Sequence, residues 1–282
     1  MARAAQVLRR IDQPEPPPLE VVPQGRLLTG VDLGTAYLVL VVLDEQGQPL
    51  AGEYQFAQVV RDGLVVDYIG AVDRLSAMKA RVEARLGRPL QEAASSFPPG
   101  VPRAEVQATA NVVQAAGLLC DQLVDEPTAA NALLGLQNGA IVDVGGGTTG
   151  IAIIEDGQVV YTADEATGGT HFSLVIAGAQ GLSFEEAEEL KKDPAQQTRL
   201  LPVVRPVMEK VASITARHIQ AYQASGGRTV ESLTLVGGTS AFPGMAEVVQ
   251  RYTGLPTSVP DWPMFVTPLG IALSNQRNEG TD

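Results

Sequence analysis

The sequence predicts an α/β fold that contains two related domains. Short apolar runs of the kind found in strands alternate along the 282-residue chain with segments whose apolar residues recur at helical spacing. One arrangement also occurs twice: an apolar strand that contains an aspartate, then a glycine turn, then a second apolar strand. The two aspartates are Asp32 and Asp143. An internal repeat of this kind indicates a duplicated domain.

We expect three regions along the chain. Residues 1–25 are expected to form a flexible tail and linker, residues 26–139 a first domain, and residues 140–266 a second domain. Residues 1–11 place apolar side chains at helical spacing, and the residues that follow them are rich in proline. Two interpretations of the tail stay open: a segment without a role, or an amphipathic peptide that docks on a partner protein.

The first domain begins with the repeated arrangement. Residues 27–43 predict a short strand, a turn at Gly34 and Thr35, and a longer apolar strand. A helix is predicted over residues 71–86, because one apolar stripe is formed by Val72, Leu75, Met78, Val82 and Leu86. The other elements predicted here are a strand with a turn and two helices, over residues 93–100, 104–119 and 126–136.

The second domain repeats the arrangement in residues 141–154, with the sequence IVDVGGGTTGIAII. The G-x-G-x-x-G pattern of dinucleotide-binding turns is matched by Gly145, Gly147 and Gly150. That motif must open a helix, however, and here the turn leads into β-branched residues and then into the hairpin signal Asp156-Gly157. The segment therefore predicts three strands and excludes a dinucleotide site. The other predicted elements are two helices and a strand, over Phe184–Lys192, Pro206–Gln223 and residues 232–238.

The composition excludes several classes of protein. A formal net charge of −12 argues against nucleic acid as a partner, because phosphate binding favours a basic face. A single cysteine, Cys120, excludes a disulfide framework and favours a reducing compartment. No apolar stretch approaches the roughly 20 residues that span a bilayer, and residues 1–25 lack the apolar core of a signal peptide. We therefore expect a soluble, cytoplasmic protein.

The two glycine turns predict an anionic ligand. Turns without side chains let backbone N–H groups approach a phosphate closely. An aspartate beside such a turn cannot bind phosphate, but it can hold a divalent cation, usually through water when the cation is Mg²⁺. Two such turns that face each other across a cleft, each with a carboxylate, are typical of a nucleoside triphosphate site.

Five motifs together resemble the actin/Hsp70/sugar-kinase superfamily. Two are similar to its phosphate motifs, GVDLGTA at residues 30–36 and DVGGGTTG at residues 143–150. The other three are similar to its first connecting motif, its adenosine motif and its second connecting helix, with the sequences DEPTAA (125–130), LVGGTSAFPGM (235–245) and TPLGIALS (267–274). The resemblance implies an actin-like ATPase fold with two RNase H-like domains and a C-terminal helix, residues 267–276, that packs on the first domain.

The intervals between the motifs imply that the outer subdomains are reduced. In Hsp70 a large outer subdomain follows the opening sheet of the first domain, whereas here only Gly52 to Asp62 occupy that interval. In the second domain only residues 193–204 separate the two predicted helices. The expected architecture is therefore two RNase H-like domains whose outer parts are trimmed.

Within this superfamily the chain resembles the chaperone-like proteins of ethanolamine utilisation. The similarity lies in VVRDGLVVDYIGAV (59–72), SSFPPG (95–100), ADEATGGTHFS (163–173) and EEAEELKKDP (185–194). This resemblance implies ATP or ADP with Mg²⁺ as cofactors, and ethanolamine ammonia-lyase or microcompartment proteins as partners. It also implies a location in the cytoplasm or at the bacterial microcompartment, without a nucleic acid or membrane partner.

The superfamily resemblance assigns a site to individual residues. Asp32 and Asp143 would face a hydrated Mg²⁺, and Glu126 would lie near its water ligands. The catalytic roles would fall to Asp32, Glu126, Asp143 and Thr148. The phosphate turns would be formed by Gly34, Thr35, Gly145, Gly146, Gly147 and Thr148, and the nucleoside would contact Gly168, Gly169, Glu188, Lys191, Gly237, Gly238 and Thr239. For Glu188 and Lys191 a second interpretation stays open, because pairs three residues apart are common on solvated helix faces.

Three departures from the Hsp70 pattern predict at most slow ATP hydrolysis. An aspartate of the second phosphate motif is replaced by Gly150, and the arginine that stacks on adenine is replaced by Ala241. The catalytic lysine of Hsp70 lies in the outer subdomain that this chain lacks. Two alternatives to the chaperone-like function stay open: a small-molecule kinase of the same superfamily, and a scaffold or filament that binds ATP without hydrolysing it.

Overall fold

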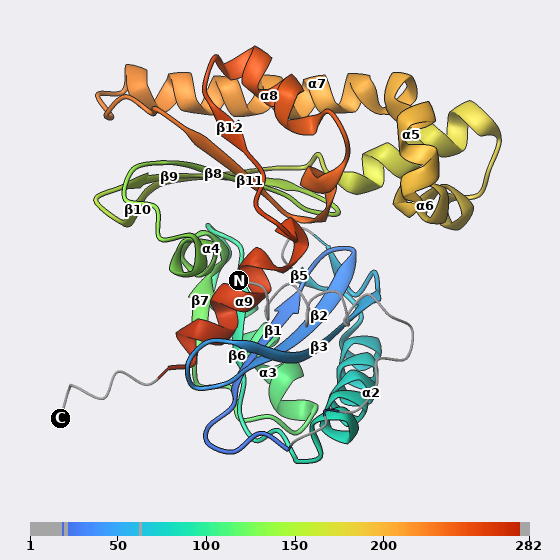
Figure 1. The fold of residues 1–282 in the computed structure, drawn as a ribbon, viewed down its shortest axis with the longest axis vertical. Helices are drawn as coiled ribbons and strands as arrows, with labels where there is room; N and C mark the ends of the chain where they lie inside the picture. Colours follow the sequence, from blue (N-terminus) through green and yellow to red (C-terminus); the bar gives the residue numbers. More distant parts are fainter. Residues whose placement is uncertain (1–18, 20–21, 62–63, 277–282) are drawn as a thin grey trace. The chain divides into compact units, whose positions relative to one another are not determined.

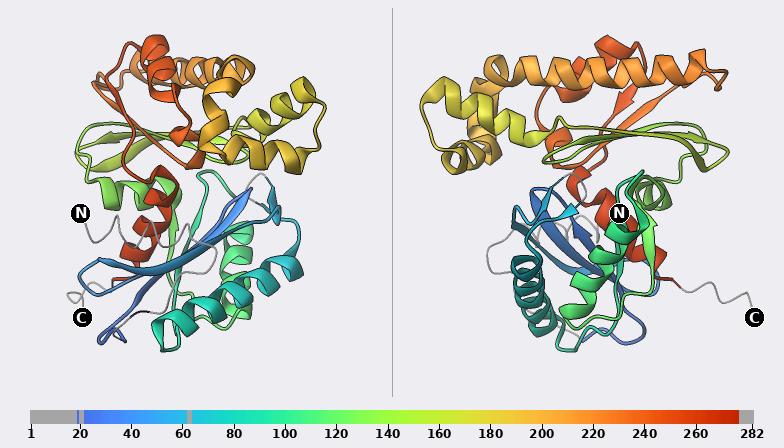
Figure 2. Two further views of the ribbon diagram at one scale, coloured as in Figure 1. Left: turned by 45° about the vertical axis from the view of Figure 1, so that its right-hand side comes forward. Right: turned by 180° about the vertical axis from the view of Figure 1, so that it is seen from behind.

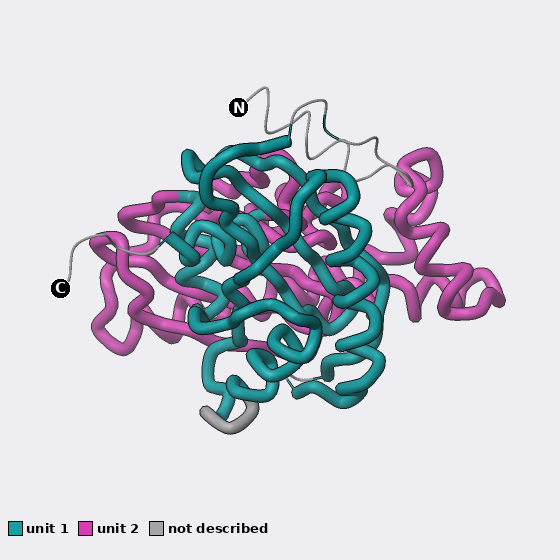
Figure 3. Tube along the Cα trace, turned by 90° about the horizontal axis from the view of Figure 1, so that it is seen from below, with its two compact units in different colours: residues 1–134, 266–282 teal, residues 135–265 magenta. Residues whose placement is uncertain are grey.

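The structure is a computed structural model that describes residue 19, residues 22–61 and residues 64–276. The chain divides into two compact units, whose helices and strands are labelled in Figure 1 and which have different colours in Figure 3. Unit 1 consists of residues 1–134 and 266–282, and unit 2 consists of residues 135–265. The helix predicted over residues 1–11 lies outside the described residues.

Unit 1 contains a five-stranded sheet in the order β3-β2-β1-β6-β7. Its strands are β1 (Leu28–Leu33), β2 (Tyr37–Leu43), β3 (Pro49–Phe56), β6 (Ala94–Phe97) and β7 (Leu123–Asp125). The strand that carries Asp32 is central, because β1 pairs antiparallel with β2 and parallel with β6. A separate small hairpin is formed by β4 (Val60–Arg61) and β5 (Leu64–Val65).

Unit 2 repeats this topology with a sheet in the order β10-β9-β8-β11-β12. Its strands are β8 (Gly139–Val144), β9 (Thr149–Glu155), β10 (Gln158–Glu165), β11 (Leu233–Val236) and β12 (Thr257–Ser258). Like β1, the central strand β8 pairs antiparallel with the next strand along the chain and parallel with a later one. The duplication predicted from the two hairpins, and the three strands predicted from residue 141 onward, are therefore confirmed.

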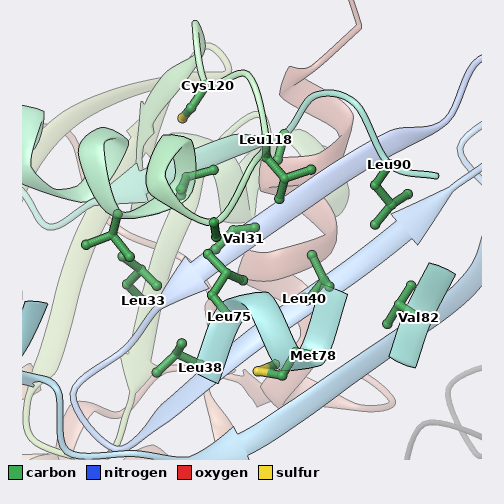
Figure 4. Packing of buried hydrophobic residues seen from close by; sticks show 14 of the residues in the cluster. Val31, Leu33, Leu38, Leu40, Leu75, Met78, Val82, Leu90, Leu118 and Cys120 are labelled. Carbon is green, nitrogen blue, oxygen red and sulfur yellow. The ribbon is translucent and has the colours of Figure 1, made fainter. Parts of the chain in front are cut away.

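The helices of unit 1 cover its sheet, and they are α2 (Tyr68–Leu86), α3 (Arg103–Ala115), α4 (Glu126–Leu134) and α9 (Val266–Ser274). The stripe predicted on α2 is buried at Leu75, Met78, Val82 and Leu86. Figure 4 shows Leu75 and Met78 close to Val31 and Leu40 of the central strands. Cys120 belongs to the same core, and burial raises the pKa of its thiol to about 11. Cys120 is therefore a buried structural residue of this core.

Helix α9 lies close to both β1 and α4 within unit 1. A side chain at Gly30 would come within 2.6 Å of the Pro268 carbonyl oxygen, and one at Gly270 would collide with the backbone of Ala129. Both contacts require glycine, since real Cβ atoms do not approach backbone atoms so closely. Gly30 therefore lets the C-terminal helix pack directly on the strand that carries Asp32, and Gly270 lets the same helix pack directly on α4.

The helices of unit 2 are α5 (Gly169–Gln180), α6 (Phe184–Lys192), α7 (Pro194–Ala224) and α8 (Met245–Thr253), with short 3-10 turns η1 (Gly238–Ala241) and η2 (Pro263–Phe265). Helix α7 runs along one face of the sheet, and α5 and α6 pack against its N-terminal half (Figure 2). Helix α6 has the predicted bounds, because Ser183 and Glu186 form a reciprocal cap at its start.

The sequence placed the start of the next helix incorrectly. We expected it at Pro206, whereas α7 begins at Pro194, so that residues 194–204 are helical and not a connecting loop. Asp193 caps the new start by accepting the N–H of Ala195. Pro202 and Pro206 each remove a helical hydrogen bond, at a cost of about 3 kcal/mol. The buried residues Leu200, Val204 and Met208 offset this cost, since each burial contributes roughly 1.5–3 kcal/mol.

The expected linker is held to unit 1 at its C-terminal end. The N–H of Leu19 donates a 3.0 Å hydrogen bond to the Arg85 carbonyl oxygen, and the Leu19 side chain packs against the core. The guanidinium of Arg88 donates to the carbonyl oxygens of Pro23 and Gly25. At Leu19, Pro23 and Gly25 the segment expected to be a flexible linker is bonded to unit 1, through Arg85 of α2 and through Arg88, two residues after that helix ends.

None of the helices in the described ranges is both long and apolar enough to cross a membrane.

Candidate functional site

The end of β8 presents Asp143 beside two glycines, Gly150 and Gly237. Asp143 pairs with Gly150 of β9 on one side and with Val236 of β11 on the other. A side chain at Gly237, where φ is +84°, would collide with the Asp143 carboxylate and lie 2.6 Å from the Val144 carbonyl oxygen. The partly buried carboxylate therefore occupies space that only glycine leaves open.

The turn after β8 is closed by its own backbone and held by two other segments. The N–H of Gly145 donates to the Thr148 carbonyl oxygen at 3.0 Å. The Gly145 carbonyl oxygen accepts from the Gly169 N–H at 2.9 Å and from the Thr239 hydroxyl at 3.0 Å. The Gly146 carbonyl oxygen accepts from the Thr170 N–H at 2.7 Å. The first turn of α5 and the start of η1 therefore fix the orientation of two successive peptide groups.

This orientation determines where the N–H groups of the turn point. A trans peptide places its N–H opposite its carbonyl, and the described residues contain no cis bond. Since the carbonyls of Gly145 and Gly146 point toward α5, the N–H groups of Gly146 and Gly147 point away from it. Successive N–H groups on one side of a turn form a concave site for an anion.

The first turn of α5 approaches this turn closely because two glycines lie there. A side chain at Gly168 would come within 2.8 Å of the carbonyl oxygens of Gly145 and Gly146, and one at Gly169 would collide with the Thr239 hydroxyl. The N–H of Gly168 donates to Nδ1 of His171 at 3.2 Å, so this histidine caps its own helix. His171 was not among the predicted site residues, and its role here is structural.

Glu188 and Lys191 form a buried network beside the same helix turn. The Lys191 ammonium donates to Oε2 of Glu188 at 2.6 Å and to the Gly169 carbonyl oxygen at 3.0 Å. The hydroxyl of Ser173 donates to the same Glu188 oxygen at 2.6 Å. Glu188 is only 4% exposed, so the interpretation as a solvated ion pair is wrong. Burial lowers the pKa of Lys191, and the Glu188 charge opposes that shift.

The predicted residues after β11 are Gly237, Gly238 and Thr239, and they lie beside the turn after β8. Gly237 ends the strand next to Asp143, and Gly238 is exposed, with Met264 as the nearest neighbour of an added side chain. The Thr239 hydroxyl is bound to the Gly145 carbonyl oxygen. Thr239 therefore contacts the turn after β8 in its own unit. The sequence did not reveal this contact because Thr239 and Gly145 are 94 positions apart.

Unit 1 carries a turn of the same construction. Asp32 is the second-to-last residue of β1, as Asp143 is of β8, and it pairs with Val39. The N–H of Gly34 donates to the Tyr37 carbonyl oxygen at 3.0 Å, which matches the bond from Gly145 to Thr148. A side chain at Gly34 would lie 2.8 Å from that oxygen, so the turn requires glycine. Thr35, the next residue of the turn, is half-buried.

Glu126 lies at the same edge of the unit 1 sheet as Asp32. It is the first residue of α4 and directly follows β7, while Asp32 lies near the end of β1. Strands β1, β6 and β7 are parallel neighbours, so their carboxyl ends share one edge. Two strand spacings of about 4.8 Å separate β1 from β7. The two acids therefore lie at the same edge of the sheet, two strands apart.

The predicted residues thus form two groups. In unit 2 the structure brings together Asp143, Gly145, Gly146, Gly147, Thr148, Gly168, Gly169, Glu188, Lys191, Gly237 and Thr239, with Gly238 at the margin. In unit 1 it brings Asp32, Gly34, Thr35 and Glu126 to one sheet edge. Sequence reasoning missed Ser173 and Thr170, although the spacing of Ser173 four residues after Gly169 places both on one helix face.

Direct metal coordination by a cluster of side chains is not seen in the described part of the chain. No group of three or more histidine, cysteine, aspartate or glutamate side chains there could hold a metal ion. In each unit taken by itself, Asp143 in unit 2 and Asp32 and Glu126 in unit 1 are carboxylates of the kind that contact Mg²⁺ through its water ligands.

Comparison with protein-family models gives one match. The family model described as type IV pilus assembly protein PilM matches residues 104–267. That range begins at α3 and ends at the second residue of α9, so it includes the whole of unit 2.

Two curated relatives illustrate the range of similarity. The ethanolamine utilization protein EutJ of Escherichia coli K12 is 45% identical, over 90% of this chain and 87% of that protein. A chaperone protein HscA homolog of Burkholderia thailandensis is 28% identical, over 78% of this chain and 44% of that protein.

Solved structures show the fold. The crystal structure of EutJ from Carboxydothermus hydrogenoformans has a TM-score of 0.85 and 48% identity, covering 90% of this chain and 92% of that chain. MreB5 of Spiroplasma citri bound to AMPPNP has a TM-score of 0.69 at 17% identity, covering 90% and 97%. The type IV pilus PilM–PilN complex has a TM-score of 0.73 at 15% identity, covering 87% and 97%. The predicted actin-like ATPase fold is therefore confirmed.

Proposed function

The chain belongs to the EutJ family of ethanolamine utilization proteins, and on this basis we propose that it is a nucleotide-binding, chaperone-like accessory protein of ethanolamine utilisation. Its cofactors are ATP or ADP with Mg²⁺. It acts in the cytoplasm on ethanolamine ammonia-lyase or on the assembly of a bacterial microcompartment. The observation that carries the nucleotide part is the turn after β8, whose Gly146 and Gly147 N–H groups share one side.

The phosphate groups of the nucleotide bind to these N–H groups. The backbone of Gly145–Gly147 carries no side chain that would keep an anion away, and its carbonyls are already bonded to α5 and η1. The turn is therefore preorganised, so little conformational entropy is lost when the anion binds. The matching turn at Gly34 and Thr35 contributes the second phosphate contact, as the superfamily resemblance implies.

The carboxylates hold the metal. Asp143 and Asp32 lie two residues before the first glycine of each turn, and each would hold Mg²⁺ through water, as the superfamily resemblance implies. Glu126 would help to hold the water ligands of Mg²⁺. Bound Mg²⁺ neutralises phosphate charge, which is the chemistry that it supplies in phosphoryl transfer. The solved structures of MreB5 with AMPPNP and with ADP support nucleotide as the ligand of this fold.

Nucleotide binding, and not fast hydrolysis, is the main activity of the site. Gly150 faces Asp143 across the strand pair where Hsp70 has a further aspartate. Lys191 is the cation bound to the first turn of α5, but it is paired with Glu188, so its charge is largely neutralised. Removing one preorganised stabilising group typically costs about 10²–10³ in rate. The alternative of an ATP-binding scaffold differs from this proposal only in having no client.

Co-purification tests the accessory function. Tagged protein from cells growing on ethanolamine is expected to retain ethanolamine ammonia-lyase or a microcompartment protein, and Asp143→Ala is expected to retain less of it. The same purification from cells growing without ethanolamine serves as the background control. Equal recovery of both candidates with the wild type and with an untagged control would overturn the chaperone-like function and leave the scaffold alternative.

A further inference from the structure

The residues after β12 are fixed beside the end of β11. The N–H of Gly237 donates to the Pro263 carbonyl oxygen at 2.9 Å, and the N–H of Phe265 donates to the Trp262 carbonyl oxygen at 2.9 Å. Pro263 and Phe265 are buried, so the short turn η2 is anchored at both of its ends. Met264 lies between them and is only half-buried. The anchored backbone therefore determines where the Met264 side chain lies.

The Met264 side chain lies against Gly238, which is the exposed residue among those predicted to contact the nucleoside. A Cβ added at Gly238 would lie 3.7 Å from Cγ of Met264 and 3.8 Å from its sulfur, and its three nearest atoms all belong to Met264. Gly238 directly precedes Thr239, which is bonded to the turn after β8. A ligand group in the space over Gly238 therefore contacts Met264, within reach of the phosphate turn.

Trp262 adopts a backbone conformation that bulky residues rarely take. Its φ is +58°, and the other residue besides glycine with a positive φ in the described ranges is Asp156, a residue type that tolerates this region. Strained residues of this kind persist where the surrounding structure holds them, and they cluster at ligand sites. The chain thus holds its one tryptophan, half-buried, in a strained conformation two residues before Met264.

The chemistry of this segment suits the flat face of a nucleobase. Hsp70 stacks an arginine on adenine, whereas the corresponding residue here is Ala241, which carries no charge. A thioether makes favourable contacts with aromatic rings, and an indole offers a large apolar face. The thioether is only a weak acceptor and the indole has a single donor, so neither group distinguishes one purine from another by hydrogen bonding.

We propose that the base of the nucleotide packs against Met264 beside Trp262, a contact that rests on the nucleotide binding proposed above. This apolar surface takes the place of the missing arginine and holds the base by its face, without reading its polar edge. The site therefore accepts adenine and guanine nucleotides with similar affinity. The same contact contributes nothing to a ligand that has phosphates but no base.

Substitution of Met264 tests the contact by titration calorimetry in Mg²⁺ with ADP, GDP or pyrophosphate. We expect Met264→Ala to weaken the binding of ADP and of GDP about 10-fold each, because part of a buried apolar side chain is lost, and to leave pyrophosphate binding unchanged. Met264→Leu keeps the apolar volume and is expected to retain the wild-type affinity. The matched control is Tyr252→Ala, which removes a 42% exposed side chain from α8 of the same unit.

The fluorescence of Trp262 gives a second measurement in the unmodified protein. Because Trp262 is the one tryptophan of the chain, its emission reports on this segment alone. We expect ADP and GDP to quench the emission, since a base that packs on Met264 lies beside the indole. Pyrophosphate is expected to leave the emission unchanged.

The outcomes separate the base contact from nucleotide binding. A wild-type protein that binds neither the nucleotides nor pyrophosphate would contradict nucleotide binding, and the base contact with it. Nucleotide binding that Met264→Ala does not weaken, or that does not change the Trp262 emission, would overturn the base contact alone. A loss of affinity for ADP without an equal loss for GDP would show that the site reads the base edge, which also overturns the proposal.

Discussion

The hydroxyl of Thr239 donates a 3.0 Å hydrogen bond to the carbonyl oxygen of Gly145, 94 residues earlier in the chain. Because that carbonyl also accepts the N–H of Gly169, three separate segments of unit 2 meet at one peptide group. The superfamily resemblance assigned Thr239 to the nucleoside. The structure places its hydroxyl on the turn, so its effect on a nucleotide passes through the orientation of the Gly146 N–H.

Thr239→Val is expected to weaken ATP and ADP binding about 5- to 10-fold, because loss of one hydrogen bond of about 1 kcal/mol loosens the turn. Thr239→Ser keeps the hydroxyl and should bind like the wild type. Titration calorimetry with both variants measures the difference. Equal affinities of the valine and serine variants would exclude a positioning role for the hydroxyl.

The buried ion pair beside α5 predicts a large and asymmetric effect on stability. Lys191→Met leaves Glu188 buried with only part of its partners, and removal of one member of a buried pair typically costs about 3–5 kcal/mol. The double variant Glu188→Gln, Lys191→Met removes both charges and should recover most of that loss. Urea denaturation measures both free energies of unfolding. A single variant as stable as the double variant would contradict this reading of the network.

The same lysine predicts a pH dependence. Its pKa is lowered in the folded protein relative to the ordinary value of 10.5, so the unfolded chain binds the proton more tightly. The penalty for the charged form is therefore present in full at low pH and is relieved as the pH rises toward 10.5. We expect the free energy of unfolding of the wild type, relative to Lys191→Met, to increase as the pH rises toward 10.5. A decrease over that range would show that pairing with Glu188 outweighs burial.

Truncation separates the tail from the segment that α2 holds. Deletion of residues 1–18 is expected to change the melting temperature by less than about 2 °C, since Leu19 and residues 22–25 keep their contacts. Deletion of residues 1–25 also removes the packing of Leu19 and both acceptors of Arg88, and should lower the melting temperature by about 2–4 °C for each kcal/mol lost. Scanning calorimetry of the two deletion variants measures the difference. Equal melting temperatures would show that Leu19 and residues 22–25 do not stabilise unit 1.

The sequence predicts local features of this fold well and long-range features poorly. Helix α6 has its predicted bounds because Ser183 and Glu186, three positions apart, form a reciprocal cap at its start. The two hairpins follow from short runs of glycine and β-branched residues. Helix α7 begins 12 residues before the predicted start. The prediction missed these residues because Pro202 and Pro206 argue against a helix, whereas in the folded chain the burial of Leu200 and Val204 stabilises one. Burial is a property of the folded chain and leaves no local signal.

The candidate site shows the same division. Glycines and acids at the turns could be found from spacing, because each pattern lies within ten residues. Ser173 and Thr170 could not, since their roles depend on contacts with Glu188 and Gly146 from other elements. The nucleotide assignments of the site residues stay predictions.

Slow hydrolysis is a further expectation of the site. Purified protein is expected to turn over ATP only marginally above an Asp32→Ala blank, because Gly150 and the paired Lys191 leave the phosphates without an additional catalytic group. Steady-state phosphate release measures the rate. Robust turnover that disappears in Asp32→Ala would show that the remaining carboxylates and Mg²⁺ suffice for catalysis.

The central claim is that the turn after β8 binds the phosphates of a nucleotide. The direct measurement is the melting temperature with millimolar Mg²⁺ and ATP or ADP, for the wild type, Gly146→Val and Gly178→Ala. Gly178 lies on α5 with no heavy atom near an added Cβ, so its variant controls for the loss of a glycine. A ligand that binds only the folded state raises the melting temperature. We predict a rise for the wild type and Gly178→Ala that is lost in Gly146→Val; no rise with either nucleotide, or an equal rise in all three proteins, would contradict the account.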